Sequence, residues 1–230
     1  MSLRLSNRRD VIRWAIWGIV IVLFAVVLIR VISFEGSYYS EKDGSERAVA
    51  EGTQQEAEEE LVEVPPTSDE VVEYTVEPDR PRYLTIERLG IINARILAVG
   101  VNSKQELDTP RNIFDVGWYD RSAKPGQGGA IVIDGHNGGP HVHGVFKDLP
   151  SLVVDDTIKI ERGDGVIFKY KIVDNKAVLL NISEKFMKEA INKPENGKET
   201  LTLITCTGEW SDQQKTYLSR QFTRAVLVED

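Results

Sequence analysis

The residues of this sequence best suited to chemistry are one cysteine and one histidine, each at the end of an apolar run. Cys206 is the only cysteine of the chain and directly follows the run 201–205. His136 follows the run 130–134, with one glycine between them. A thiolate is a strong nucleophile, and it needs a base or a positive charge nearby in order to form. This arrangement predicts Cys206 as a nucleophile and His136 as the leading candidate for its base.

Two arginines near the C-terminus are candidate positive partners for the cysteine. Arg220 and Arg224 lie four residues apart in the run 217–225. In a regular strand both side chains therefore lie on the same face, and alternation does not choose between them. A guanidinium beside a thioester-forming cysteine can donate hydrogen bonds to a developing oxyanion or hold the substrate backbone.

Two other interpretations of these residues stay open. A free cysteine is often buried as a small hydrophobic residue, and a single cysteine excludes a disulfide within the chain. His136, His141 and His143, together with Cys206, are also residue types that bind zinc, which would suit a zinc-dependent hydrolase. Their spacing fits no zinc motif, and glycines lie between the first two histidines, which would make that loop flexible.

The elements that must position these residues are mostly strands. Short β-type runs separated by turn residues fill the second half of the chain and predict an all-β barrel or sandwich. The predicted strands are 83–86, 94–99, 130–134, 158–161, 166–173, 177–180, 201–205 and 218–228. One segment predicts a helix, with Ser183 as its N-cap and Pro194 after its end. Residues 145–149 predict a helical turn.

Charge divides the chain into three parts. Residues 1–34 carry five basic residues and one acidic residue, whereas residues 35–79 carry two basic and fifteen acidic residues. Residues 80–230 are nearly neutral, so the net charge of −8 reflects the middle part. The folded part has no cluster of Lys and Arg, so we expect no nucleic-acid partner.

Residues 11–34 predict a transmembrane signal anchor that contacts membrane lipid. The run is apolar apart from Arg13 and Arg30 near its ends, whose long side chains can reach the interface. About 20 apolar residues are enough to cross a bilayer. Basic residues precede the run and acidic residues follow it, so residues 1–10 are predicted to be cytoplasmic and the domain extracellular. No small-residue cleavage site follows the run, which favours an anchor over a removed signal peptide.

Residues 35–79 predict an acidic, disordered linker between the anchor and a domain at 80–230. Low hydrophobicity combined with high charge cannot form a core. Within the linker, residues 71–76 alternate enough to form a strand against the domain. The predicted organisation is therefore a short cytoplasmic N-terminus, an anchor, a tether and one catalytic domain outside the cell.

Residues 80–230 resemble the sortase family and lean away from its housekeeping class A. The resemblance rests on the Asp134-Gly135-His136 box, on Thr-Leu-Ile-Thr205-Cys206, and on Arg220 followed five residues later by an alanine. Three further runs contribute to it: Val116-Gly-Trp118-Tyr119, Pro125-Gly-Gln-Gly-Gly and Gly144-Val-Phe146-Lys-Asp-Leu149. The order of histidine, cysteine and arginine along the chain is that of the family, and the Val-Gly-Trp-Tyr run differs from class A.

The resemblance implies an eight-stranded sortase β-barrel with one or two short helices, acting as a cysteine transpeptidase. It implies Cys206 as nucleophile, His136 as general acid and base, and Arg220 as the stabilising arginine. Thr205 matches a position that helps bind substrate or the intermediate. Family members cleave a C-terminal sorting signal resembling Leu-Pro-x-Thr-Gly after the threonine. A thioacyl enzyme forms, and an amine of a cell-wall precursor or a pilin resolves it.

The expected partners are therefore surface proteins or pilins that bear such a signal, together with the amine acceptor. No cofactor is expected, and calcium dependence stays open. A non-catalytic adhesin or pilus module is the main alternative, because it would also suit an anchor, a tether and a β-domain. That alternative does not explain a lone cysteine accompanied by His136 and Arg220.

Overall fold

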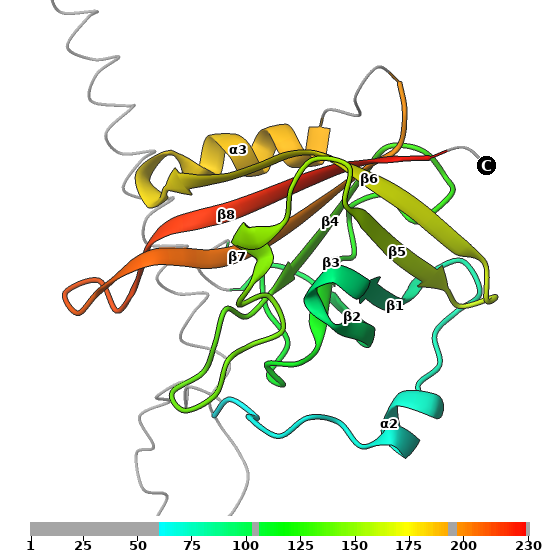
Figure 1. Cartoon of the computed structure of the whole chain (residues 1–230), viewed down its shortest axis with the longest axis horizontal. Coiled ribbons are helices and arrows are strands. Elements are labelled where there is room, and N and C mark those ends of the chain that lie inside the picture. Colours follow the sequence, from blue (N-terminus) through cyan, green and yellow to red (C-terminus); the bar gives the residue numbers. More distant parts are fainter. Residues whose placement is uncertain (1–59, 103–105, 193–196, 229–230) are drawn as a thin grey trace, which may run out of the picture. The chain divides into compact units, whose positions relative to one another are not determined.

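The computed structural model describes residues 60–102, 106–192 and 197–228 (Figure 1). The predicted anchor at 11–34 and residues 35–59 of the predicted linker lie outside these ranges. Within them, no helix combines the length and the apolar character that crossing a membrane requires. The anchor therefore stays a prediction.

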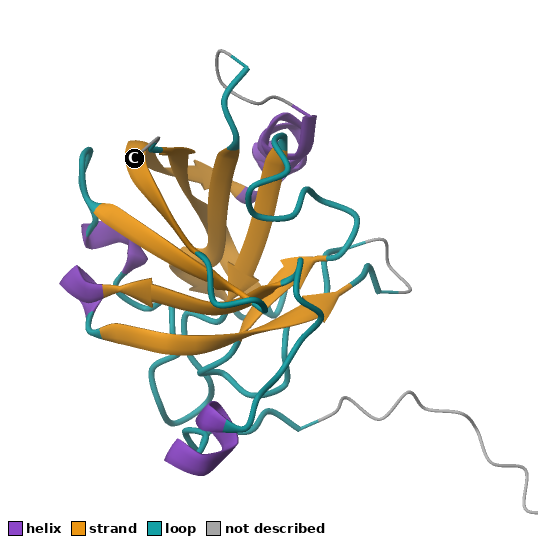
Figure 2. Cartoon of the chain, turned by 90° about the vertical axis from the view of Figure 1, so that its right-hand side faces the viewer, coloured by secondary structure: helices purple, strands orange, loops and turns teal. Residues whose placement is uncertain are grey.

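Eight strands in the described part of the chain close into a barrel, in the order β1-β2-β3-β4-β7-β8-β6-β5 (Figures 1 and 2). They are β1 (Pro81–Ile86), β2 (Ile91–Val99), β3 (Val116–Tyr119), β4 (Ala130–Gly135), β5 (Thr157–Arg162), β6 (Ile167–Leu179), β7 (Thr200–Ser211) and β8 (Thr216–Leu227). The pairs β2–β3 and β4–β7 are parallel, and the other pairs are antiparallel. The barrel implied by the family resemblance is confirmed, and the sandwich that the strand pattern also allowed is excluded.

The strands β4, β7 and β8 have two buried faces, which is why β4 and β7 read as continuous apolar runs. One face points into the barrel and joins the main core, where Ile131 and Leu203 are fully buried. The other face points outward and forms a second core with Val132, Ile204 and Phe222. Burial of a large apolar side chain contributes about 1.5–3 kcal/mol. Both faces therefore stabilise these three strands.

The helix α3 (Leu180–Asn192) packs on this second core. It follows β6 directly and lies along the outer side of the barrel (Figures 1 and 2). Phe186 of the helix packs on Phe222 of β8, with ring centroids 5.8 Å apart. The N-cap predicted at Ser183 is wrong. The helix begins three residues earlier, and the Ser183 hydroxyl donates to the Leu180 carbonyl oxygen within the first turn.

Two strand predictions differ from the structure. The sequence did not predict β3, because this strand has only four residues and no flanking alternation. The runs predicted at 166–173 and 177–180 form one long strand, β6, with Leu180 already in the helix. A register shift between Ile172 and Asp174 lets polar residues continue the strand where the sequence suggested a break.

The predicted turn at 145–149 is present. The Leu149 N–H donates to the Phe146 carbonyl oxygen at 3.2 Å, and the 3-10 helix η2 (Leu149–Ser151) continues the turn. A second 3-10 helix, η1 (Glu87–Leu89), joins β1 to β2. It ends at Gly90, whose φ of 68° is a left-handed conformation that glycine adopts at little cost.

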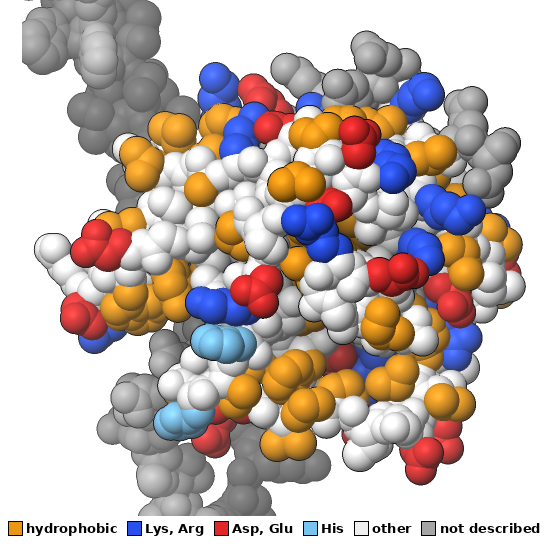
Figure 3. Space-filling view, in the orientation of Figure 1, with side chains coloured by type: hydrophobic (Ala, Val, Ile, Leu, Met, Phe, Trp, Pro, Cys, Tyr) orange, Lys and Arg blue, Asp and Glu red, His pale blue; other side chains and the backbone are white. Residues whose placement is uncertain are grey.

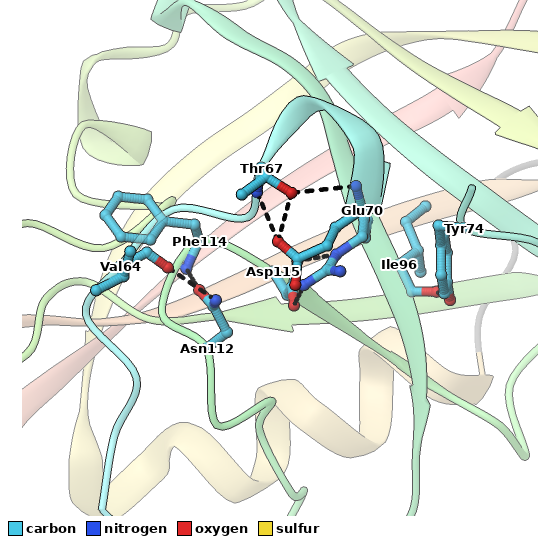
Figure 4. Close-up of polar contacts among 9 residues, drawn as sticks. Val64, Thr67, Glu70, Tyr74, Ile96, Asn112, Phe114 and Asp115 are labelled. Carbon is cyan, nitrogen blue, oxygen red and sulfur yellow. Dashed lines mark hydrogen bonds and ion pairs between the residues drawn. The ribbon is translucent and has the colours of Figure 1, made fainter. Parts of the chain in front are cut away.

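Residues 60–79, here called the N-terminal strap, correct the prediction of disorder for this part of the acidic segment. The strap contains the helix α2 (Ser68–Val72), which begins with a capping box between Thr67 and Glu70 (Figure 4). Residues 71–76 form the end of this helix and a loop instead of the predicted strand. The Tyr74 hydroxyl donates to the Ile96 carbonyl oxygen of β2. Local caps and contacts with the barrel thus order a segment whose composition predicts disorder.

The strap also pairs with the loop that precedes β3. Val62 forms an isolated parallel bridge with Asn112. The Asn112 side chain donates to the Val64 carbonyl oxygen at 3.0 Å and accepts from the Phe114 N–H at 3.0 Å (Figure 4). Further along, the Glu63 carboxylate accepts from the His141 N–H at 2.9 Å. The strap therefore contacts the loop that follows His136.

The surface of the domain mixes charges of both signs. Lys and Arg side chains alternate with Asp and Glu side chains on the face drawn in Figure 3. Surface pairs such as Arg88 with Asp156 at 3.2 Å contribute at most about 1 kcal/mol each. This distribution agrees with the near-neutral charge of residues 80–230.

Candidate active site

The pairing of β7 with β8 places Cys206 directly opposite Arg220. Directly opposite residues share a face, with their β-carbons about 4.5–5.5 Å apart. Ile204 and Phe222, each two residues from this pair, belong to the second core on the outward face. Because side chains alternate along a strand, Cys206 and Arg220 lie on that same outward face, beyond the second core.

The pairing of β4 with β7 brings His136 to the same place. These strands are parallel and in constant register, from Ala130 with Thr200 to Asp134 with Ile204. The ladder ends two residues before His136 and Cys206, so continuation of the same register brings His136 beside Cys206. A hydrogen bond of 2.8 Å from the Asn137 side chain to the Cys206 carbonyl oxygen spans this point. The three residues predicted to carry the chemistry therefore come together at one end of three adjacent strands.

The register also separates the two arginines. Arg224 pairs with Thr202, whereas Arg220 pairs with Cys206. Four residues of strand correspond to about 13 Å, so only Arg220 lies beside the thiol. Strand alternation alone left this choice open.

The strand β7 continues past Cys206, which the sequence predicted to stand at a strand end. A register shift follows between Thr207 and Trp210, and Gly208 within it has a φ of 84°. A β-bulge of this kind bends the strand and increases its twist, and bulges are common beside active sites. His136, in contrast, lies directly after the last residue of β4, as predicted.

The family model described as "Sortase domain" matches residues 84–228. The chain belongs to the sortase family. Sortases are cysteine transpeptidases, and the match includes all three residues that the register brings together.

Several solved sortases are similar to this one. Sortase C-1 from Actinomyces oris is 21% identical, with 67% of this chain and 76% of that chain covered and a TM-score of 0.48. Sortase D5 from Clostridium perfringens is 22% identical, with 70% and 86% covered and a TM-score of 0.47. Sortase A from Corynebacterium diphtheriae is 25% identical, with 66% and 62% covered and a TM-score of 0.46.

One curated protein also matches part of the chain. The lipoprotein-releasing system ATP-binding protein LolD of Ehrlichia chaffeensis is 34% identical over 76 residues. This match covers 33% of the sortase chain and 30% of LolD, so the chain spans less than a third of that relative.

The ring of His136 is held by a backbone carbonyl. Its Nε2 lies 2.9 Å from the Pro110 carbonyl oxygen. A carbonyl only accepts hydrogen bonds, so Nε2 carries a proton and Nδ1 is the ring atom that can take one up. Burial lowers the pKa of His136, and the hydrogen bond to Pro110 opposes this shift.

The thiol of Cys206 is about as buried as the histidine. Burial raises its pKa most, the positive charge of Arg220 lowers it, and Asp134 raises it. The directions of both shifts favour a neutral thiol and a neutral imidazole over an ion pair.

The guanidinium of Arg220 lies along its own strand. One nitrogen, Nη1, donates to the carbonyl oxygens of Tyr217 and Ser219 at 2.9 and 3.1 Å. The other, Nη2, donates to the Thr216 hydroxyl at 3.2 Å. These are contacts with half-exposed groups near the hairpin, and a substrate carboxamide or oxyanion could replace them without leaving a deeply buried group unpaired.

Thr205, which the resemblance assigns to substrate binding, faces the other way. Its side chain is 3% exposed, and its hydroxyl donates to the Gly135 carbonyl oxygen at 2.7 Å. This contact joins the end of β4 to β7 immediately before His136 and Cys206. In the described structure Thr205 thus connects the two strands from the barrel side.

Sequence reasoning did not single out Asn137, Thr109 or the carboxyl of Asp134. Asn137 follows the histidine, and its contact with Cys206 could have been suspected from that position alone. Thr109 donates to Asp134 Oδ2 at 3.0 Å across 25 residues of sequence. No local pattern signals such a contact. Asp134 lies in β4, two positions before His136, which directly follows the strand.

Burial gives Asp134 an unusual charge state. It raises the pKa of this carboxyl to about 8, against the lowering effect of the Thr109 hydrogen bond; Asp108 adds to the rise and Arg220 opposes it. One of its oxygens, Oδ1, is buried without a hydrogen-bond partner. At neutral pH the Asp134 carboxyl therefore stays largely protonated.

The other two histidines lie away from this cluster. His141 and His143 are exposed in the loop after His136, where Gly138 pairs with His143. Among the residues that the structure describes, no three His, Cys, Asp or Glu side chains are grouped as a metal ion would require.

Proposed function

We propose that this sortase cleaves a sorting signal resembling Leu-Pro-x-Thr-Gly between the threonine and the glycine. It then transfers the acyl group to an amine of a cell-wall precursor or a pilin. The substrates are surface proteins or pilins that carry the signal near their C-terminus. The basic, apolar and acidic order of residues 1–79 supports an anchor at 11–34, a cytoplasmic N-terminus and an extracellular catalytic domain.

In the first half-reaction, Cys206 Sγ attacks the threonine carbonyl carbon while His136 Nδ1 takes the thiol proton. The carbonyl oxygen becomes an oxyanion, and the Arg220 guanidinium on the facing strand stabilises it. As the intermediate collapses, His136 gives its proton to the glycine nitrogen. The carbon–nitrogen bond breaks, a glycine amine leaves, and a thioester remains on Cys206.

In the second half-reaction, the amine of the acceptor attacks the thioester carbon. His136 takes a proton from the attacking nitrogen and returns one to the sulfur as the carbon–sulfur bond breaks. A new amide forms and the free thiol is restored. Covalent catalysis thus replaces one difficult exchange of amides by two easier steps.

The observation that carries this proposal is the shared register of three strands. It pairs Arg220 of β8 with Cys206 on the outward face, and the β4–β7 ladder ends two residues before His136 and Cys206. A buried structural cysteine needs neither neighbour. A non-catalytic surface module would have no reason to bring a base and a cation to its only thiol.

The decisive experiment is to trap the thioester. The full-length chain in detergent is incubated with a panel of peptides that vary around Leu-Pro-x-Thr-Gly, without an amine acceptor, and its intact mass is recorded. The expected result is an added acyl mass on the wild type with at least one peptide, and none on Cys206→Ala. Cleavage of the same peptide, measured by fluorescence, should be lost in Cys206→Ala.

Two outcomes would contradict the proposal. Normal cleavage by Cys206→Ala would show that another group is the nucleophile. A wild type that forms no adduct and cleaves none of the peptides would favour the non-catalytic module, provided that the protein is folded by circular dichroism.

A further inference from the structure

Asp134 occupies a position between the active site and the loop that precedes β3. It lies on the outward face of β4, two residues before His136. Its side chain is half-buried, and its buried oxygen Oδ1 has no hydrogen-bond partner. Its other oxygen, Oδ2, accepts from the Thr109 hydroxyl at 3.0 Å. The only hydrogen bond of this carboxyl that the structure describes thus leads to the loop, not to the strands.

The loop residue that follows Thr109 contacts the histidine. The Pro110 carbonyl oxygen accepts from His136 Nε2 at 2.9 Å. Two consecutive loop residues therefore bind one residue of β4 and the residue directly after that strand: Thr109 binds Asp134, and Pro110 binds His136. This two-point contact determines where the Pro110 carbonyl oxygen lies relative to the imidazole.

The strand β3 leaves room for this arrangement. Gly117 pairs with Asp134 across the β3–β4 ladder. A β-carbon at this glycine would lie 3.0 Å from the Pro110 ring, 3.0 Å from the Val99 side chain and 3.1 Å from Asp134 Oδ1. The loop, the carboxyl and the strand are thus packed against one another at the one place where β3 has no side chain.

We propose that Asp134 is a positioning residue for the general acid and base. Through Thr109 it holds the Pro110 carbonyl against His136 Nε2, which keeps Nδ1 free for proton transfer. This inference rests on the proposed role of His136. Asp134 itself does not touch the reacting atoms.

The electrostatics agree with a carboxyl that acts by hydrogen bonding and not by charge. The charged or titratable groups that act on it are Asp108 from the loop, Arg220 from β8 and Cys206 from β7. Burial keeps Asp134 protonated up to a pKa of about 8. In the neutral form it does not oppose formation of a thiolate at Cys206, whereas its ionised form raises the pKa of that thiol.

The test measures the tautomer of His136 directly. The chain has three histidines, so selective ¹⁵N labelling of the full-length protein gives three ring systems, and His136→Gln assigns the relevant one. The wild type should show His136 protonated at Nε2. Asp134→Ala and Thr109→Val should shift it toward a mixture of tautomers, because the Pro110 carbonyl is no longer held in place.

Kinetics supply the second measurement. In Asp134→Ala and Thr109→Val, kcat for the peptide should fall about tenfold while KM changes little, because one orienting hydrogen bond is lost. Asp134→Asn and Thr109→Ser keep a hydrogen-bonding group and should retain both the tautomer and most of kcat. Thr202→Val is the matched control, because its buried hydroxyl has no hydrogen-bond partner.

A wild-type tautomer together with a wild-type kcat in both Asp134→Ala and Thr109→Val would overturn the proposal. If Asp134→Ala does not fold, the comparison of Thr109→Val with Thr109→Ser decides it alone, because neither change removes a carboxyl. The tautomer is observed without substrate. If the wild type transfers no peptide, the proposed function fails while the tautomer still tests the positioning.

Discussion

The outward face of β4, β7 and β8 has two regions with opposite physical character. The first, here called the apolar floor, consists of Val132, Ile204 and Phe222. The second, here called the polar end, consists of Asp134, His136, Cys206 and Arg220. Both regions use the same strands, the same face and the same ladder of hydrogen bonds. The apolar floor is covered by the apolar side of α3. The polar end carries the titratable side chains.

This difference separates stability from chemistry within a single sheet. The floor removes large apolar side chains from water, which stabilises the domain. The polar end instead holds an unpartnered carboxyl oxygen, a histidine of lowered pKa and a thiol of raised pKa. Each of these is a burial cost that function retains and stability alone would remove. The contrast predicts that substitutions at the polar end change activity and can even stabilise the fold. Substitutions in the apolar floor should destabilise the fold and leave activity nearly unchanged.

The largest expected effect is the response of Asp134→Asn to pH. The folded domain keeps this carboxyl protonated up to a pKa of about 8, whereas the unfolded chain ionises it near 4. The folded state therefore binds more protons between these values, and the wild type loses stability as pH rises through this range. The shift corresponds to an upper limit of about 6 kcal/mol. Urea unfolding measures the free energy of unfolding at pH 5 and pH 8. The difference between variant and wild type should shift in favour of the variant at pH 8. An equal difference at both pH values would contradict a raised pKa.

Phe222→Ala should have the next largest effect and act only on stability. Phe222 is buried in the floor against Phe186 of α3, and truncation of such a residue costs about 3–5 kcal/mol. Unfolding by denaturant measures this loss, and Phe222→Leu should lose less. The kinetic constants of the folded fraction should stay close to those of the wild type. A large fall in kcat at unchanged stability would show that the floor takes part in the chemistry.

Arg220→Ala should lower kcat/KM about 10²–10³-fold, because it removes a donor to the developing oxyanion. Arg224→Ala is the matched control on the same strand and the same face, four residue pairs away from the thiol. It should lower kcat/KM only a few-fold. Peptide cleavage by the two variants, compared at equal folded concentration, measures the contrast. The opposite ranking would mean that Arg224 is the arginine that serves the thiol.

The smallest expected effect concerns Thr205, which faces the barrel instead of the site. Thr205→Val leaves the Gly135 carbonyl oxygen without its donor and should destabilise the domain by about 1 kcal/mol. Thr205→Ser keeps the hydroxyl and should lose less. Denaturant unfolding and the KM for the peptide are measured together. Unchanged stability with a strongly raised KM would instead support the substrate-binding role that the family resemblance implies.

The local pattern of this chain was enough for the strands other than β3 and for the candidate nucleophile. Apolar runs ending at Cys206 and near His136 predicted strands, and β7 and β4 are the strands that bear them. Both runs are buried on two faces, so their signal in the sequence is strong. The family resemblance added the closed barrel and the choice of Arg220. These inferences needed only residue types and their order along the chain.

Composition was misleading for the strap. Its acidic, weakly hydrophobic sequence predicted disorder, but the capping box at Thr67 and the contact of Tyr74 with β2 order it. Mean charge describes a segment by itself, whereas these contacts depend on surfaces that only the folded barrel presents.

The partners of each side chain required the folded chain. Alternation assigns a strand residue to a face but does not say which residue of another strand lies beside it, because register is set by contacts distant in sequence. For that reason the pattern could not separate Arg220 from Arg224, could not show that Thr205 turns inward, and could not connect Thr109 with Asp134. The sequence supplies the thiol, the imidazole and the guanidinium; the closure of the barrel places them on one face and positions the loop that orients the histidine.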